Sequence, residues 1–166
     1  DFESLGRVIE SQIGNGMDYL VALGTTAETA TLSQVEKQRV IDFVVTQTAA
    51  RVPIMVGIGG NSTSEVIHQI NSFNLSKVAG ILSVVPYYNK PTQEGIYQHF
   101  TAIAAASPLP IVVYNVPGRT AINMTGGDWT NNGATTTMTG STVTFSNTGA
   151  DQNINGTAAT KGFNAL

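Results

Sequence analysis

The strongest constraint on the fold is a repeat in which an apolar run is followed by an amphipathic segment, with a period of roughly thirty residues. Apolar runs begin near residues 19, 53, 80 and 110, and each of the first three precedes a segment with helical periodicity. The runs are almost continuously apolar, which is typical of parallel strands that are buried on both faces. The sequence therefore predicts an α/β fold in which helices connect parallel strands.

Helix signals precede and separate the expected strands. Apolar residues at helical spacing over residues 2–13 predict a first helix that stops at Gly14-Asn15-Gly16. The segments Ser33–Glu36 and Ser62–Glu65 both have the pattern of a capping box, and another helix is expected from about Thr92. These helices alternate with strands expected at residues 19–23, 53–57, 80–85 and 110–114.

A doubly wound sheet and part of a (β/α)8 barrel both fit this order of elements. The segment Gly57-Ile58-Gly59-Gly60 lacks the spacing of a dinucleotide-binding fingerprint. The barrel is favoured because polar residues follow the expected strands, at the end where barrel enzymes build their active sites. These residues are Thr25, Thr26, Tyr87, Tyr88, Tyr114, Asn115 and Arg119. The sequence predicts a partial (β/α)8 TIM barrel of about four βα units, followed by a β or loop tail.

The segment Gly24-Thr25-Thr26-Ala27-Glu28-Thr29 lies between the first expected strand and the helix signal at Ser33. Such a strand-to-helix turn directs backbone N–H groups and threonine hydroxyls beyond the strand end, where they can hold a carboxylate. A Gly-Thr-Thr turn is also a frequent tight connection. The segment alone therefore does not establish a binding site.

Composition narrows the possible functions. Only 11% of the 166 residues are charged and the formal net charge is −3, so no nucleic-acid partner is expected. The chain has no cysteine, which excludes disulfides and thiolate metal sites. No apolar run has the length of a membrane span, and the chain opens with neither a signal peptide nor an initiator methionine. We expect no membrane partner and a start inside a longer parent.

Three motifs occur in the order Gly24-Thr-Thr-Ala-Glu-Thr29, Pro86-Tyr-Tyr-Asn-Lys-Pro91 with the following residues 93–100, and Tyr114-Asn-Val-Pro-Gly-Arg-Thr120. Together they closely resemble the dihydrodipicolinate synthase (4-hydroxy-tetrahydrodipicolinate synthase) family of pyruvate-dependent class I aldolases. The resemblance covers about residues 1–124, and its arginine fits this family better than the N-acetylneuraminate lyases. It implies a cytoplasmic, homo-oligomeric lyase of lysine biosynthesis, on the diaminopimelate pathway, that uses no cofactor and no metal.

The resemblance also implies roles for individual residues. Thr26 and its turn would bind the carboxylate of pyruvate, and Arg119 would bind the carboxylate of aspartate semialdehyde. Thr25, Tyr88 and Tyr114 would form a catalytic hydroxyl relay that moves protons, with Tyr88 contributed by a neighbouring subunit. The residue types agree with this chemistry, because imine formation needs several proton transfers at one carbon.

A second set of positions matches the site at which regulated members of the family bind feedback lysine. These positions are Asn61, Glu65 and Tyr87. Gln34 and Lys37, however, stand where those members often have histidines. The resemblance therefore does not decide whether lysine regulates this chain.

The resemblance fails after Thr125. The family's Schiff-base lysine belongs to a Gly-Ile-Lys-Glu-like segment whose place falls near Thr142, where no lysine occurs, and Lys161 has a different context. From Gly126 onward the chain is rich in Thr, Gly, Asn and Ser and weakly resembles the β repeats of bacterial surface proteins. We expect a partial barrel over residues 1–124 and an unrelated β or irregular tail over residues 125–166.

Two functional hypotheses follow. The first is a synthase-like lyase that condenses pyruvate with aspartate semialdehyde, although the chain alone is expected to be inactive without the lysine, and its status as an enzyme stays open. The alternative is a noncatalytic binding or surface protein built on a barrel relic. In a third hypothesis, a partner protein supplies the remaining strands of the barrel and the Schiff-base lysine. A partial barrel also has two open strand edges, so the isolated chain is expected to aggregate or associate through them.

Overall fold

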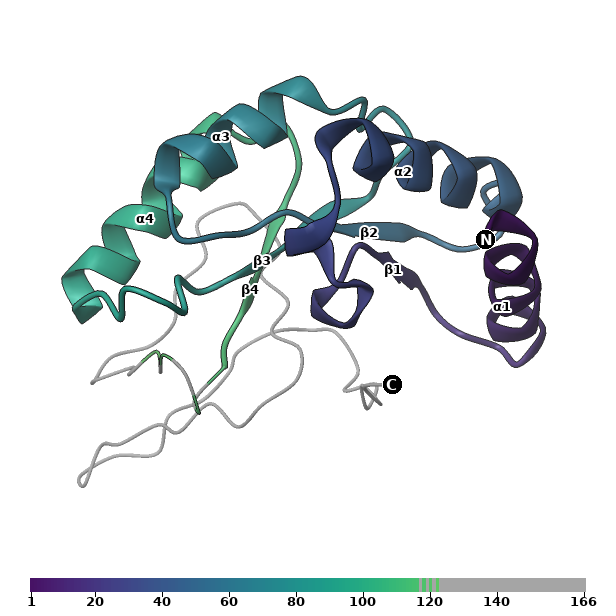
Figure 1. Ribbon diagram of the computed structural model, residues 1–166, viewed down its shortest axis with the longest axis horizontal. Helices are drawn as coiled ribbons and strands as arrows, with labels where there is room; N and C mark the ends of the chain where they lie inside the picture. The colour runs from purple at the N-terminus through teal and green to yellow at the C-terminus, as the bar shows by residue number, and fades with distance from the viewer. Residues whose placement is uncertain (117, 119, 121, 123–166) are drawn as a thin grey trace, which may run out of the picture.

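The computed structural model describes residues 1–116, 118, 120 and 122, in which a leading helix is followed by alternating strands and helices (Figure 1). The expected tail lies outside these residues, so the domain boundary near residue 125 stays a prediction. Among the described helices, none combines the length and the apolar character needed to cross a bilayer. The helices are α1 (Phe2–Gly14), α2 (Gln34–Thr48), α3 (Thr63–Ser72) and α4 (Gln93–Ala106), and the strands are β1 (Leu20–Ala22), β2 (Ile54–Gly57), β3 (Gly80–Val84) and β4 (Ile111–Tyr114).

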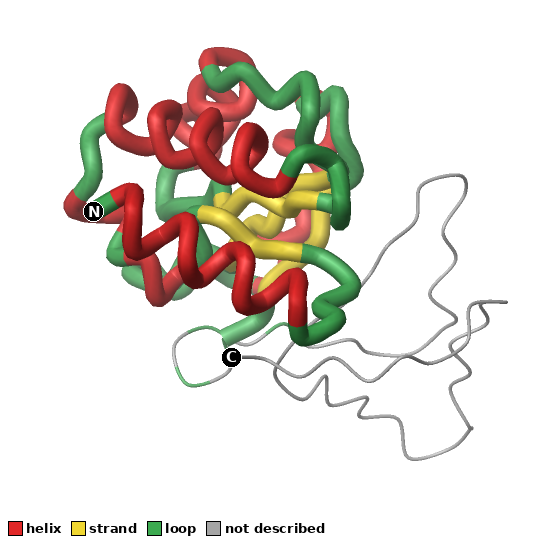
Figure 2. Tube along the Cα trace, turned by 90° about the vertical axis from the view of Figure 1, so that its right-hand side faces the viewer, coloured by secondary structure: helices red, strands yellow, loops and turns green. Residues whose placement is uncertain are grey.

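The strands form one parallel sheet in the order β1-β2-β3-β4. Leu20 is paired with Ile54, Met55 with Gly80 and Ile81 with Ile111, so each strand lies beside the next one along the chain. Figure 2 shows the helices packed around the strands. The prediction of parallel strands connected by helices is confirmed, and each strand is one or two residues shorter than expected.

The helix starts follow from their capping residues. Ser33 and Glu36 form the complete capping box of α2, as predicted. The box predicted for α3 is only half formed: the Ser62 hydroxyl accepts the Glu65 N–H, but the Glu65 carboxylate accepts from Gln34 and Gln69 instead of returning to Ser62. This prediction was wrong in its second half because competing amide donors surround the glutamate.

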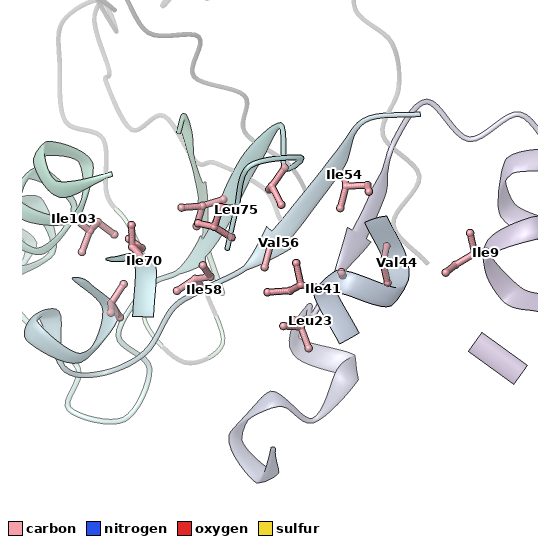
Figure 3. Packing of buried hydrophobic residues seen from close by; sticks show 14 residues of the cluster. Ile9, Leu23, Ile41, Val44, Ile54, Val56, Ile58, Ile70, Leu75 and Ile103 are labelled. Carbon is pink, nitrogen blue, oxygen red and sulfur yellow. The ribbon is translucent and has the colours of Figure 1, made fainter. Parts of the chain in front are cut away.

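The hydrophobic core lies between the sheet and the helices (Figure 3). Strand residues that alternate along the sheet, such as Val56 and Ile81, point into this layer and are completely buried. They pack against helix residues such as Ile41, Ile70 and Ile103. This sheet–helix layer therefore supplies the apolar burial that stabilises the fold.

The other face of the sheet carries the remaining strand side chains, and it is less well covered. Register and alternation place Val21, Met55, Leu82, Val112 and Tyr114 on this face, which would line the interior of a closed barrel. Val21 is 44% exposed, and Met55, Leu82 and Tyr114 are only partly buried. We call this set of side chains the inner face.

The two edges of the sheet predict self-association. Within the described residues, β1 pairs only with β2 and β4 only with β3, so both edge strands present unpaired N–H and C=O groups. We expect light scattering after size exclusion to give a mass above the 17.4 kDa of one chain. Val21→Lys, on the exposed part of the inner face, should weaken this association. Val35→Lys, at a 71% exposed position of α2, is the matched control, and a cooperatively melting monomer would contradict the prediction.

A buried histidine connects α3 and α4. The His99 ring lies among buried residues, its Nδ1 is 2.8 Å from the hydroxyl of Thr63, and its Nε2 has no partner within the described part of the chain. Burial lowers the pKa of the His99 imidazole below its ordinary value. This placement agrees with the interpretation of His99 as a packing residue, whereas His68 is exposed on α3.

This histidine should make stability depend on pH. As the pH falls below the ordinary value of 6.5, the unfolded chain takes up a proton that folded His99 resists. The free energy of unfolding should therefore decrease from about pH 6.5 until the pH passes the lowered pKa. His99→Gln should flatten this slope in denaturant titrations at several pH values, whereas the exposed-site control His68→Gln should keep it. Equal slopes in both variants would argue against His99 as the cause.

Candidate functional site

The candidate site is the edge of the sheet at which all strands end. Because the strands are parallel, their carboxyl ends meet at this edge, as in the active sites of barrel enzymes. Loops that follow the strands carry the predicted residues to it. Thr25 and Thr26 follow β1, Asn61 follows β2, Tyr87 and Tyr88 follow β3, and Tyr114 is the last residue of β4.

The loop after β1 is tightly constrained. Thr25–Ala27 forms a 3-10 helix, and the Ala27 N–H donates to the Gly24 carbonyl at 2.9 Å. Leu23 and Glu28 flank this turn with φ angles of 56° and 51°, in the left-handed region that side chains disfavour. Both threonines are exposed, so their hydroxyls are open to a ligand.

A glycine of the neighbouring strand makes room for this turn. A Cβ atom at Gly57 would overlap the carbonyl oxygen of Leu23 and would lie 2.7 Å from its carbonyl carbon. The backbone of the turn therefore rests directly on the end of β2. Gly57 has a structural role in the site that the sequence analysis missed, because only the dinucleotide-binding pattern was tested there.

The side chain of Asn61 contacts the loop after β3. The Asn61 side-chain oxygen accepts the backbone N–H groups of Tyr87 and Tyr88, each at 2.9 Å. The side chain of Tyr88 is 84% exposed, and Tyr87 is partly buried. The structure thus brings together Asn61 and Tyr87, two of the three residues expected at a lysine site.

The third residue of that set, Glu65, lies on the first turn of α3. Its Oε1 accepts from the Gln34 amide at 3.3 Å and from the Gln69 amide at 3.0 Å. The side chain of Gln34, on the neighbouring helix α2, thus donates a hydrogen bond to the Glu65 carboxylate. Both amides bind the same oxygen, and a carboxylate has about four acceptor positions, so Glu65 can still accept a further donor.

The loop after β4 is closed by its own hydrogen bonds. The Thr120 N–H donates to the Val116 carbonyl at 2.9 Å, and the buried Asn115 side chain accepts the Ile122 N–H at 3.1 Å. Asn115 was noted as a polar residue at a strand end but was not assigned a role. Arg119 lies outside the described residues, so its role in binding remains a prediction.

The residues of the predicted relay lie at the carboxyl ends of β1, β3 and β4, but their hydroxyls are not joined. Within the described part of the chain, the hydroxyls of Thr25, Tyr88 and Tyr114 form no hydrogen bond with one another. The described lysines are Lys37 on α2, Lys77 before β3 and Lys90 after β3. No group of three or more described His, Asp or Glu side chains is arranged to hold a metal ion.

A parallel sheet in chain order, helices over its outer face and polar side chains at its carboxyl edge define the class of (β/α)8-barrel proteins. The sequence model of the Dihydrodipicolinate synthetase family matches residues 1–138. The chain belongs to this family. The match confirms the resemblance drawn from the three motifs.

Curated relatives are similar to the first three quarters of the chain. The 4-hydroxy-tetrahydrodipicolinate synthase of Parabacteroides distasonis is 58% identical over 125 residues, which cover 75% of this chain and 42% of the relative. The synthase of Azobacteroides pseudotrichonymphae is 55% identical over the same length and with the same coverage. The chain therefore spans about two fifths of the length of these relatives.

Solved structures give the same result. The dihydrodipicolinate synthase of Aquifex aeolicus has a TM-score of 0.69 and 43% identity, over 74% of this chain and 43% of that one. A chloride-inhibited synthase of Acinetobacter baumannii in complex with pyruvate has a TM-score of 0.70 and 45% identity, with the same coverage. The partial-barrel prediction is confirmed for the matched part.

Proposed function

We propose that this chain carries the pyruvate-binding and proton-transfer part of a 4-hydroxy-tetrahydrodipicolinate synthase, which condenses pyruvate with aspartate semialdehyde in lysine biosynthesis. One observation carries the proposal: the Gly24–Thr26 turn, Tyr88 and Tyr114 lie at the carboxyl ends of β1, β3 and β4 in a member of this family. The complex of the Acinetobacter baumannii relative with pyruvate supports the choice of substrate.

Each residue has a defined task in this proposal. The exposed turn at Thr26 binds the pyruvate carboxylate through N–H and hydroxyl groups, and Arg119 binds the carboxylate of the semialdehyde. Protons pass between the hydroxyl oxygens of Thr25, Tyr88 and Tyr114 as the imine forms and breaks. The 84% exposure of Tyr88 supports its contribution to a neighbouring subunit of a homo-oligomer. A cytoplasmic location belongs to the same proposal.

The imine itself requires a lysine that this chain lacks at the family's position near Thr142. We therefore expect no pyruvate adduct when the chain is incubated with pyruvate and borohydride and its intact mass is measured. The full-length Parabacteroides distasonis relative should be labelled. A chimera that joins residues 1–122 of this chain to the remaining part of that relative should also be labelled, because the relative supplies the lysine.

Variants of the chimera test which hydroxyl groups belong to the proton relay. Tyr114→Phe should slow labelling because it removes a proton-transferring hydroxyl. Tyr97→Phe removes the same atom from a 63% exposed position on α4 and should leave labelling unchanged. An adduct on the unmodified chain would mean that another lysine, such as Lys90 or Lys161, forms the imine. A folded but unlabelled chimera would favour the noncatalytic alternative.

A further inference from the structure

We propose that Asn61 is a positioning residue for Tyr88. Its side-chain oxygen holds the backbone of Tyr87 and Tyr88 and thereby limits where the Tyr88 hydroxyl can lie. The proposal rests on the proposed function for the task of Tyr88. The contact that carries it, however, is a geometric feature of the chain and needs no substrate.

The contact joins two loops that are far apart in the sequence. Asn61 follows β2 and directly precedes Ser62, the N-cap of α3. Its Oδ1 accepts the N–H of Tyr87 and the N–H of Tyr88, both at 2.9 Å, across 26 and 27 residues of sequence. The side-chain amide of Asn89 also approaches the Asn61 carbonyl, at 3.5 Å. The loop after β3 is therefore tied to the start of α3.

An asparagine oxygen is well suited to this task. An amide oxygen has two lone pairs, and two successive N–H groups converge on it here. Asn61 is itself held in place, because it is partly buried between the end of β2 and a capped helix. The acceptor thus lies in the short loop between β2 and α3, directly before the N-cap of α3, and the donors lie in the loop after β3.

Tyr88 depends on this backbone contact because little else restrains it. Its side chain is 84% exposed, and its hydroxyl forms no hydrogen bond with the described residues. The position of the Tyr88 backbone then limits the region that the phenol can reach, and its χ angles select positions within that region. If Asn61 lost its oxygen, the hydroxyl would be presented over a wider range of positions, and proton transfer would suffer.

The same geometry restricts how Asn61 can meet a ligand. Its oxygen is already occupied by two donors, so only its Nδ2 hydrogens remain to bind another group. A ligand at Asn61 would therefore have to offer an acceptor, such as a carboxylate. An effector bound there would touch the residue that holds Tyr88.

Hydrogen exchange of the full chain, resolved by residue, tests the proposal. Asn61→Leu removes the acceptor at similar size, and Asn61→Asp keeps an oxygen at the same place. We expect the amides of Tyr87 and Tyr88 to exchange about tenfold faster in Asn61→Leu. They should stay near their original rates in Asn61→Asp, and the β3 amides of Leu82 and Val84 should be unchanged in both.

Unchanged exchange at Tyr87 and Tyr88 in Asn61→Leu would overturn the proposal. Equal acceleration in Asn61→Asp would also overturn it, because the retained oxygen would then not be what holds the loop. Loss of protection throughout β3 would show a global and not a positioning role. In the labelled chimera, Asn61→Leu should slow imine formation and Asn61→Asp should restore it. Exchange needs no pyruvate, so failure of the proposed function would appear only in the labelling.

Discussion

Gly57→Ala should disrupt both the fold and the turn that carries Thr25 and Thr26. The added Cβ would overlap the carbonyl oxygen of Leu23 and lie 3.2 Å from the nitrogen of Gly24. These are backbone atoms, which cannot rotate away as a flexible side chain would. We expect a loss of about 3 kcal/mol in the free energy of unfolding, at the upper end of overpacking effects. Urea titration followed by circular dichroism measures this loss.

Gly60, three residues later in the loop after β2, is the matched control, because it tests whether alanine is harmful there without a clash. A Cβ at Gly60 would lie 3.7 Å from the side chain of Val66, an ordinary van der Waals distance. Gly60→Ala should therefore be close to the unsubstituted chain in stability. Amide exchange at Ala27, which donates to the Gly24 carbonyl, should be fast only in Gly57→Ala. Equal stability of the two variants would mean that the turn does not rest on β2.

Helices and strands could be predicted because their signals are local. The apolar run at residues 110–114 and the Ser33–Glu36 pattern each specify an element within a few residues, and the structure contains both. The conformations of the site loops do not follow from local signals. Leu23 and Glu28 have left-handed backbones, although neither is the glycine or asparagine that usually indicates this conformation. The Leu23 carbonyl lies against Gly57 at the end of β2, a contact that no local pattern contains.

The contacts that join one site loop to another are long-range. Asn61 binds Tyr87 and Tyr88 across 26 and 27 residues, and Glu65 takes the amide of Gln34 across 31 residues instead of closing its capping box. A sequence pattern within one segment cannot show that a residue in it has a hydrogen-bond partner in a distant segment. The motifs therefore indicated which side chains gather at the carboxyl edge, whereas the bonds between the loops required the structure.

We expect the second large effect in β3, where two neighbouring residues face opposite sides of the sheet and should differ in how much they stabilise the fold. Ile81 is completely buried in the sheet–helix core, whereas Leu82 points to the inner face and is only partly buried. Ile81→Ala should lower the free energy of unfolding by about 2–5 kcal/mol, because it leaves a cavity in a layer that cannot collapse freely. Leu82→Ala removes the same number of carbons and should cost at most about half as much.

The comparison of these two variants also reports on what covers the inner face in solution. At a protein concentration low enough to keep the chain monomeric, the denaturant midpoint should fall much further for Ile81→Ala than for Leu82→Ala. Equal losses would mean that Leu82 is as well covered as the core, against the prediction. A cost of Leu82→Ala that grows with protein concentration would place a second copy of the chain on that face, because association stabilises only the state that it binds.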